Sequence, residues 1–311
     1  MRTANCVLLS VVALTFFGAM AQTNAHSTGA ELTAQIRSQE AVVAQAPGSG
    51  DGSAWLKLAV LEQDAARYDD AEHAYEKAAR LLKKGDQTLL AVALDRLGTT
   101  YVEQGRFSKA EPLERKALAL RLQAGDKRAI GTSYAHLAVL EFGKRDLGLA
   151  ETNAAMAVSL LAPEHTSNAS ANNATPEEQM SALINLALVR CAKRECAEAL
   201  PVLYRALSIA QSSYSADSIP VGFLDFLTGY AEWKNGDPRR AAEPMRRGTE
   251  ELGTQLGWGH PTYVAALRQY EHFLKQMGRM NEAAEVATRL EKFAGANTGE
   301  QRAAMGMSLL P

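Results

Sequence analysis

Cysteine, proline and net charge are all scarce in this sequence. Its 311 residues include 3 Cys and 10 Pro. Three cysteines in a chain of this length cannot form a disulfide framework, which excludes a disulfide-stapled miniprotein. The 33 Lys and Arg residues nearly balance the 35 Asp and Glu residues, for a formal net charge of -2. Because no long basic run exists, the chain lacks the electrostatic footprint of a general nucleic-acid binder, and we expect no nucleic-acid partner.

Long apolar runs are equally rare, and the most prominent one lies at the start of the chain. Residues 6–21 are mainly apolar, follow the positively charged Arg2, and end in the A-x-A sequence Ala19-Met20-Ala21. This order predicts a secretory signal peptide at residues 1–21, with an uncleaved anchor as the alternative. No later stretch of about 18 apolar residues exists. We therefore expect an extracytoplasmic protein, periplasmic or secreted, with no stable membrane insertion after signal cleavage.

What the sequence does contain is an internal repeat. Six short turns that carry Gly or a charged residue each lead to an alanine, usually near Glu. These anchor alanines are Ala71, Ala110, Ala150, Ala199, Ala241 and Ala283. By subtraction they lie 39, 40, 49, 42 and 42 residues apart. A small residue stands twelve positions before the anchor and seven positions after it in most copies. Small residues at matched heights allow two successive helices to approach closely, so each unit predicts an antiparallel helical hairpin that stacks on its neighbours.

The hairpins resemble the tetratricopeptide repeat family. The first follows the family's Trp-x-x-Leu-Gly, aromatic, Ala, aromatic, Ala pattern at Trp55, Leu58, Ala59, Tyr68, Ala71, Tyr75 and Ala78. The second follows it at Leu97, Gly98, Tyr101, Phe107, Ala110 and Ala117. The spacing exceeds the family's usual length of about 34 residues and is similar to the longer repeats of kinesin light chain. The resemblance covers about residues 53 to 294. It implies an all-α, right-handed α-α superhelix (solenoid) of about six hairpins, with a concave groove that binds a protein or peptide.

Outside the strongest repeats, the composition divides the chain into segments. We expect an N-terminal helix and flexible joint at residues 22–52, repeats 1–3 at 53–162 and repeats 4–6 at 177–295. An inserted loop at 163–176, between Pro163 and Pro176, accounts for the longest interval between anchors. A flexible tail follows at 296–311.

No motif for catalysis, cofactor binding or metal binding is recognisable. The six histidines include no H-E-x-x-H pair, and neither a phosphate loop nor a G-x-S-x-G motif occurs in a strand-to-helix setting. We therefore predict a scaffold and no enzyme, with no catalytic residues, no cofactor and no metal. Two alternatives remain open: an enzyme or enzyme subunit with an unrecognised active site, and a secreted effector or adhesin.

Cys191 and Cys196 are the cysteines that remain after signal removal, and they flank the turn of the fourth hairpin. In an oxidising compartment their proximity permits a disulfide. Such a bond would close a very small loop and so add little stability. The alternative is two buried thiols, with Cys196 in the position that Tyr68 and Phe107 take elsewhere.

The family resemblance also implies which residues line the groove. They stand 18, 15, 11, 8 and 7 positions before each anchor, which in the second hairpin gives Val92, Asp95, Thr99, Val102 and Glu103. The fifth hairpin gives an aromatic stripe, and the sixth gives basic neighbours, so these residues predict a peptide site: Phe223, Phe226, Tyr230, Trp233, Arg268, His272 and Lys275. Aromatic and Arg side chains are common interface anchors, and the set favours an apolar segment with a carboxylate. The alternative is that the rings pack in the core of a degenerate repeat.

Overall fold

The computed structural model is an array of α-helices. It describes residues 29–45, 51–65, 67–164 and 173–294, and these residues contain no strand. The predicted signal peptide, most of the inserted loop and the predicted tail lie outside the described residues. Among the described helices, none is long and apolar enough to span a membrane.

Within the described part of the chain, six helical hairpins follow the helix α2 (Gly29–Ala44). The hairpins are α3 (Gly52–Asp64) with α4 (Tyr68–Leu82), α5 (Gln87–Glu103) with α6 (Phe107–Ala124), α7 (Lys127–Gly143) with α8 (Leu147–Leu161), α9 (Pro176–Ala192) with α10 (Cys196–Ser213), α11 (Ile219–Lys234) with α12 (Pro238–Leu256), and α13 (Pro261–Gln276) with α14 (Met280–Ala294). Each helix packs on the next, and first helices of neighbouring hairpins also touch, as α5 touches α7 and α7 touches α9.

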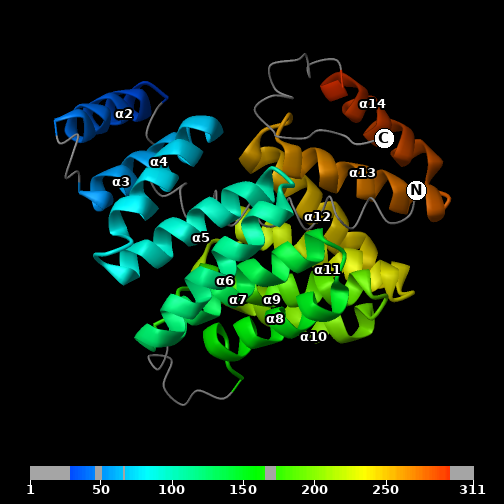
Figure 1. Cartoon of the computed structure of the whole chain (residues 1–311). Coiled ribbons are helices and arrows are strands. Elements are labelled where there is room, and N and C mark those ends of the chain that lie inside the picture. Colours follow the sequence, from blue (N-terminus) through cyan, green and yellow to red (C-terminus); the bar gives the residue numbers. More distant parts are fainter. Residues whose placement is uncertain (1–28, 46–50, 66, 165–172, 295–311) are drawn as a thin grey trace.

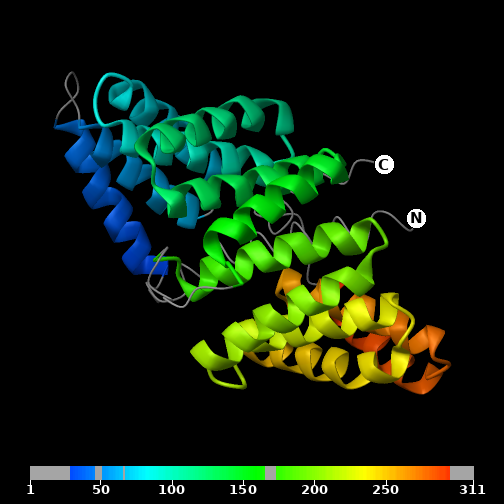
Figure 2. The ribbon, with the colours of Figure 1, turned by 90° about the horizontal axis from the view of Figure 1, so that it is seen from below.

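The hairpins stack side by side along the array (Figure 2). Figure 1 shows the helices α2–α4 and α13–α14 at opposite ends, with α6 to α10 between them. The predicted helical solenoid of about six hairpins is therefore confirmed.

The anchor alanines lie where two helices of a hairpin cross. All six are at most 1% exposed. Their small partners leave no room for a larger side chain: a Cβ on Gly98 would lie 2.7 Å from Glu114 Oε1, and one on Gly229 would lie 2.8 Å from the backbone nitrogen of Met245. Because protein interiors are close-packed, small residues at both heights fix the spacing of the two helices.

The turn inside most hairpins contains one residue in the left-handed backbone region. Gly105, Gly236 and Gly278 have φ angles of 71°, 92° and 70°, and Arg145 and Arg194 have φ angles of 66° and 70°. Glycine adopts this conformation without a Cβ clash, whereas an arginine is strained there. This requirement is the physical reason for the glycines that mark the repeats in the sequence.

Side chains cap the first helices of several hairpins. Asp86 accepts from the backbone of Thr88 and Leu89 at the start of α5, and Asp126 accepts from Ala129 at the start of α7. Thr175 and Glu178 form a capping box at the start of α9. Each cap satisfies backbone N–H groups that have no partner within the helix, so the helices begin at defined residues.

Candidate functional site

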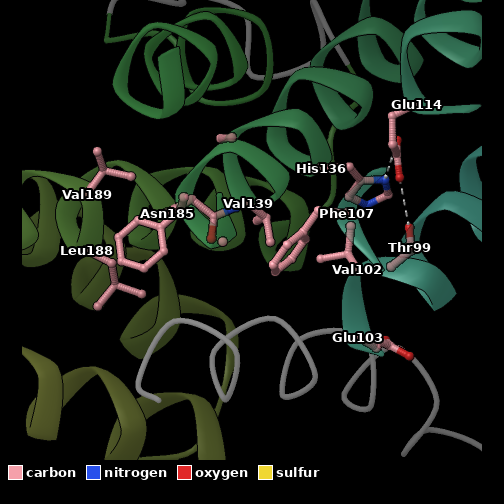
Figure 3. A pocket seen from close by; sticks show the side chains of 13 residues that line it. Thr99, Val102, Glu103, Phe107, Glu114, His136, Val139, Asn185, Leu188 and Val189 are labelled. Atoms are coloured by element: carbon pink, nitrogen blue, oxygen red, sulfur yellow. Dashed lines mark hydrogen bonds and ion pairs between the residues drawn. The ribbon is translucent and has the colours of Figure 1, made fainter. Parts of the chain in front are cut away.

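An open hollow lies between α5, α7 and α9. We call it the groove pocket. Its walls are mainly apolar and include Val102, Phe107, Val139, Phe142, Leu188 and Val189. The polar residues of its lining are Thr99, Glu103, Glu114, His136 and Asn185 (Figure 3). An apolar pocket with a few convergent polar groups is the usual form of a ligand site.

The groove positions expected from the repeat pattern account for much of this lining. Thr99, Val102 and Glu103 of α5 line the pocket, whereas Val92 and Asp95 do not. Counting back 11, 8 and 7 residues from Ala150 gives Val139, Phe142 and Gly143 of α7, which also line it. Leu188 of α9 stands 11 residues before Ala199. The spacing of the groove positions, applied to the third and fourth hairpins as well as the second, could therefore have predicted much of this pocket from the sequence.

A buried polar cluster joins α5, α6 and α7 beside the pocket. Asp95 Oδ1 accepts a hydrogen bond from Arg121 Nη1 at 2.9 Å and lies 3.0 Å from His136 Nδ1. Arg121 Nη1 also donates to Ser133 Oγ at 2.6 Å. Glu114 Oε2 lies 4.0 Å from His136 Nδ1. Asp95, Glu114 and Arg121 are 3%, 0% and 8% exposed, so solvent does not screen their charges.

The cluster separates the pKa values of its two carboxyl groups. Burial raises the pKa of Asp95, but the charges and hydrogen bonds of His136 and Arg121 outweigh burial and lower this pKa below its usual range. Burial raises the pKa of Glu114 well above its usual range, and the charge of Asp95 raises it further. The cluster therefore favours the ionised form of Asp95 and the protonated form of Glu114, because two close carboxylates cannot both ionise without compensation.

Asp95, Glu114 and His136 also place one ligand atom each within 4.8 Å of one another. Carboxylate and imidazole groups bind divalent metals such as zinc. Here, however, Asp95 Oδ1 already pairs with Arg121 and His136, so the geometry is that of a hydrogen-bonded network. Sequence reasoning missed this cluster because its residues lie on three helices, at separations that no local motif describes.

Within the described residues, Asn185 is a buried polar residue of the pocket with an unpartnered donor, and Glu114 Oε2 is an unpartnered oxygen of the same lining. Asn185 lies on α9, is 7% exposed, and its Nδ2 atom has no hydrogen-bond partner in the part of the chain that the structure describes. An unsatisfied buried donor costs about 1–3 kcal/mol. An acceptor on a ligand, such as a backbone carbonyl, would remove that cost.

Glu103 lies at the α5 side of the same pocket and is partly buried. Burial raises the pKa of its carboxyl group to about 7, and the nearby charges of Arg96 and His136 and a hydrogen bond with Gln63 reduce this rise only in part. The groove pocket therefore contains a carboxyl group whose charge is poorly compensated within the chain.

The aromatic stripe predicted to bind a peptide is buried. Phe223, Phe226, Tyr230 and Trp233 belong to one core cluster of α9 to α14. Tyr230 and Trp233 form an edge-to-face pair with centroids 5.9 Å apart, and Trp233 forms another with Phe273 at 5.6 Å. Burial of all four rings is what the core alternative predicts, because groove anchors are expected to be accessible.

The basic residues predicted beside the stripe, Arg268, His272 and Lys275, are exposed. His272 lies against Trp233, with ring centroids 5.5 Å apart, and Lys275 Nζ pairs with Glu271 at 2.6 Å. The structure thus brings His272 to the stripe. A peptide-binding role for these seven residues stays a prediction.

Cys191 and Cys196 face each other across the turn between α9 and α10. Their Cα atoms are 4.3 Å apart, and the structure pairs them in a disulfide. This is the first of the two alternatives left open by the sequence. Because the cysteines are separated by only 5 residues, the loop-closure contribution of the bond is small.

Three comparisons with known proteins bear on the fold. The tetratricopeptide repeat family model matches residues 51–123, which span α3 to α6. No curated protein matches the chain. Among solved structures, BtubC (BKLC) from P. vanneervenii is 19% identical, with a TM-score of 0.56 over 73% of this chain and 90% of that chain.

Two further structures have similar folds. A putative kinesin light chain from Podosopora anserina with nearly identical TPR-like repeats is 15% identical, with a TM-score of 0.52 over 65% of this chain and 95% of its own. A Rap protein complexed with Competence and Sporulation Factor is 14% identical, with a TM-score of 0.55 over 82% of this chain and 76% of its own. At these identities the likeness shows the fold alone. The chain is therefore a tetratricopeptide-like helical solenoid with repeats like those of kinesin light chain, and its first two hairpins carry the family's sequence pattern.

Proposed function

We propose that the protein is an extracytoplasmic scaffold that binds a protein or peptide segment in the groove pocket. The observation that carries this proposal is Asn185, whose buried amide donor lacks a partner inside an apolar pocket. Binding gains free energy when an apolar side chain leaves water and enters an apolar pocket. A ligand backbone at Asn185 would add the missing hydrogen bond and fix the orientation of the segment.

The fold supports the same function. Repeat arrays present extended surfaces built from successive first helices, and binding to such surfaces is their common use. The Rap protein of similar fold was solved in complex with Competence and Sporulation Factor, which is a precedent for ligand binding by such an array.

The enzyme alternative rests on Glu103, Glu114 and His136, since a pocket with shifted titratable groups is typical of active sites. Glu114, however, is fully buried against Gly98 and belongs to the cluster with Asp95, so its carboxyl group is engaged within the fold. Only Glu103 and His136 remain accessible, and we infer no reaction from them. Binding explains the mainly apolar walls better than catalysis does.

The extracytoplasmic part of the proposal depends on the order of charged, apolar and small residues at positions 1–21. Mass spectrometry of the protein from its native host tests it. We expect a first residue at or near Gln22. An intact Met1 on protein from the cytoplasmic fraction would contradict the proposal.

Photo-crosslinking in the native host tests the binding site. A photoreactive phenylalanine analogue replaces Leu188, which lines the groove pocket, and in a matched variant replaces Leu149, which is 47% exposed on α8. We expect partner adducts from position 188 and none of the same mass from position 149. Equal adducts from both positions, or adducts from position 149 alone, would contradict binding in the pocket.

A further inference from the structure

Charge distinguishes the two carboxyl groups that line the groove pocket. Glu114 is fully buried beside Asp95, and its burial disfavours the charged form. Glu103 is partly buried and lies at the pocket surface. The groups near Glu103 include Gln63 on α3, Tyr68 and Tyr75 on α4, Arg96 on its own helix and His136 on α7. Because Arg96 is exposed, solvent weakens its interaction with Glu103.

The rest of the pocket offers little compensation for that carboxyl group. The lining contains no Lys or Arg, and its other side is formed by Val139 and Phe142 on α7 and by Leu188 on α9. A carboxylate in such surroundings favours a cation, because a charge-assisted hydrogen bond is stronger where water is scarce. The apolar walls favour an apolar side chain. One bound segment that carries both a cation and an apolar side chain would satisfy the carboxyl group and the apolar walls together.

The spacing of the helices sets the distance between the two groups on that segment. Neighbouring packed helices lie about 8–10 Å apart. An extended chain advances about 3.3 Å per residue. A segment crossing from α5 to α7 therefore spans about three residues, and one crossing from α5 to α9 spans about five to six.

We propose that the groove pocket selects an extended segment in which Lys or Arg stands about three to six residues from an aliphatic or aromatic residue. The cation binds Glu103, the apolar side chain packs between Phe142 and Leu188, and a backbone carbonyl accepts from Asn185 Nδ2. The inference rests on the proposed function and names its ligand chemistry. The predicted charge is opposite to the carboxylate that the basic residues of the sixth hairpin favour.

Selection from a displayed library of random twelve-residue peptides tests this inference. The purified protein, its Glu103→Lys variant and its Leu188→Arg variant are used as separate baits. We expect the wild type to enrich peptides that combine an apolar residue with Lys or Arg at the stated spacing. Glu103→Lys should shift the enrichment toward Asp or Glu at the same spacing, and Leu188→Arg should abolish it.

The outcomes separate this inference from the proposed function. Enrichment of an apolar residue with Asp or Glu, or with no charge, that Leu188→Arg abolishes would overturn the ligand chemistry and leave pocket binding intact. Enrichment of the same peptides by the wild type and by Leu188→Arg, or no enrichment by the wild type, would overturn both.

The affinity of one selected peptide then tests the ion pair itself. We expect Glu103→Gln to weaken binding about 5- to 10-fold, because the amide oxygen still accepts a hydrogen bond and only the charge is lost. For the same peptide with its cationic residue replaced by Met, Glu103→Gln should change affinity less than 2-fold. The exposed Glu291 of α14 provides the matched control, since Glu291→Gln should leave both affinities unchanged. Equal losses for the two peptides upon Glu103→Gln would show that Glu103 does not bind the cation.

Discussion

The second and fifth hairpins place opposite chemistry at equivalent positions. Counted from Ala110 and Ala241, Asp95 corresponds to Phe226, Glu114 to Met245, and Arg121 to Leu252. All six side chains are buried. In the second hairpin they form a charged, hydrogen-bonded cluster, and in the fifth they form part of an apolar core. The same crossing of two helices therefore accommodates either a charged, hydrogen-bonded cluster or an apolar core.

The difference shows what a buried polar cluster and an apolar core each require. The polar cluster needs every charge to be paired, because an unpaired buried charge is strongly destabilising. The apolar core needs space for large rings, which small residues provide: a Cβ on Gly248 would overlap the backbone of Gly222 and Phe226. The apparent exception in the fifth hairpin follows the same rule, because buried Asp225 accepts from Arg247 Nη2 at 2.7 Å.

Disrupting the polar cluster of the second hairpin should have the largest effect on stability. Asp95→Asn removes the charge that pairs with Arg121 and leaves that guanidinium buried and uncompensated. We expect a loss of about 4 kcal/mol in the free energy of unfolding, measured by urea denaturation. Glu114→Gln is the matched control, because burial and the charge of Asp95 favour the neutral form of Glu114, and it should cost less than about 1 kcal/mol. Equal effects of the two variants would refute the assignment of charge within the cluster.

Disrupting the apolar core of the fifth hairpin should reduce stability somewhat less. Trp233→Ala removes a ring that packs on Tyr230 and Phe273. We expect a loss of about 3 kcal/mol, at the lower end of the range for truncation of a core tryptophan. A sharp fall in melting temperature would support the core role of the stripe. An unchanged melting temperature would instead support the prediction from the sequence that Trp233 lies in the groove site.

A second pair of equivalent positions sharpens the comparison through pH. Glu62 and Glu232 each stand nine residues before their anchors. The Oε2 atom of each carboxyl group lacks a hydrogen-bond partner among the described residues, but Glu232 Oε1 accepts from Tyr204 at 2.5 Å and lies 3.5 Å from Arg240 Nε. Burial raises the pKa of Glu62 from 4.5 to about 7, with the charge of Asp70 adding to the rise.

The folded protein therefore holds the proton of Glu62 more tightly than the unfolded chain does. The stability that this protonation contributes is complete below about pH 4.5 and is lost as pH rises through 7. We expect Glu62→Gln to stabilise the protein by about 2 kcal/mol at pH 8 and to have no effect at pH 4.5. Glu232→Gln should give no such gain at pH 8. Denaturation curves at both pH values check this, and a gain at pH 4.5 would contradict it.

The smallest effect concerns the turns. Arg145 has a φ angle of 66° where Gly105 and Gly236 occupy the equivalent position in their hairpins. Arg145→Gly should relieve this strain and stabilise the protein by about 0.5–1 kcal/mol in thermal denaturation. Gly105→Ala should destabilise it by a similar amount. Destabilisation by Arg145→Gly would show that the arginine is held by interactions that offset the strain.

The fold was predictable because its signal is local and repeated. Ala71 and Ala110 mark helix crossings, and their spacing along the chain is enough to infer stacked hairpins. The buried cluster was not predictable, because Asp95, Glu114 and His136 meet only after three helices have packed. The aromatic stripe shows a related limit: spacing places Phe226 and Trp233 on one helical face, but whether that face is open depends on what packs against it.

The groove pocket was predictable from the sequence only in part. Thr99, Val102 and Glu103 follow from the repeat spacing, whereas Phe107 enters from α6, which the spacing rule for first helices does not cover. The unsatisfied state of Asn185 Nδ2 also needed the packed structure, since a sequence does not show which polar atoms lack partners.

The central claim is that ligands bind in the groove pocket. Its most direct test is the affinity of the cross-linked partner for Leu188→Arg and Leu149→Arg, two substitutions of the same type in the pocket and on the outer helix α8. Titration calorimetry should show at least a 10-fold loss of affinity for Leu188→Arg and less than a 2-fold change for Leu149→Arg, with unchanged melting temperatures. Equal affinities of both variants and the wild type would contradict the claim.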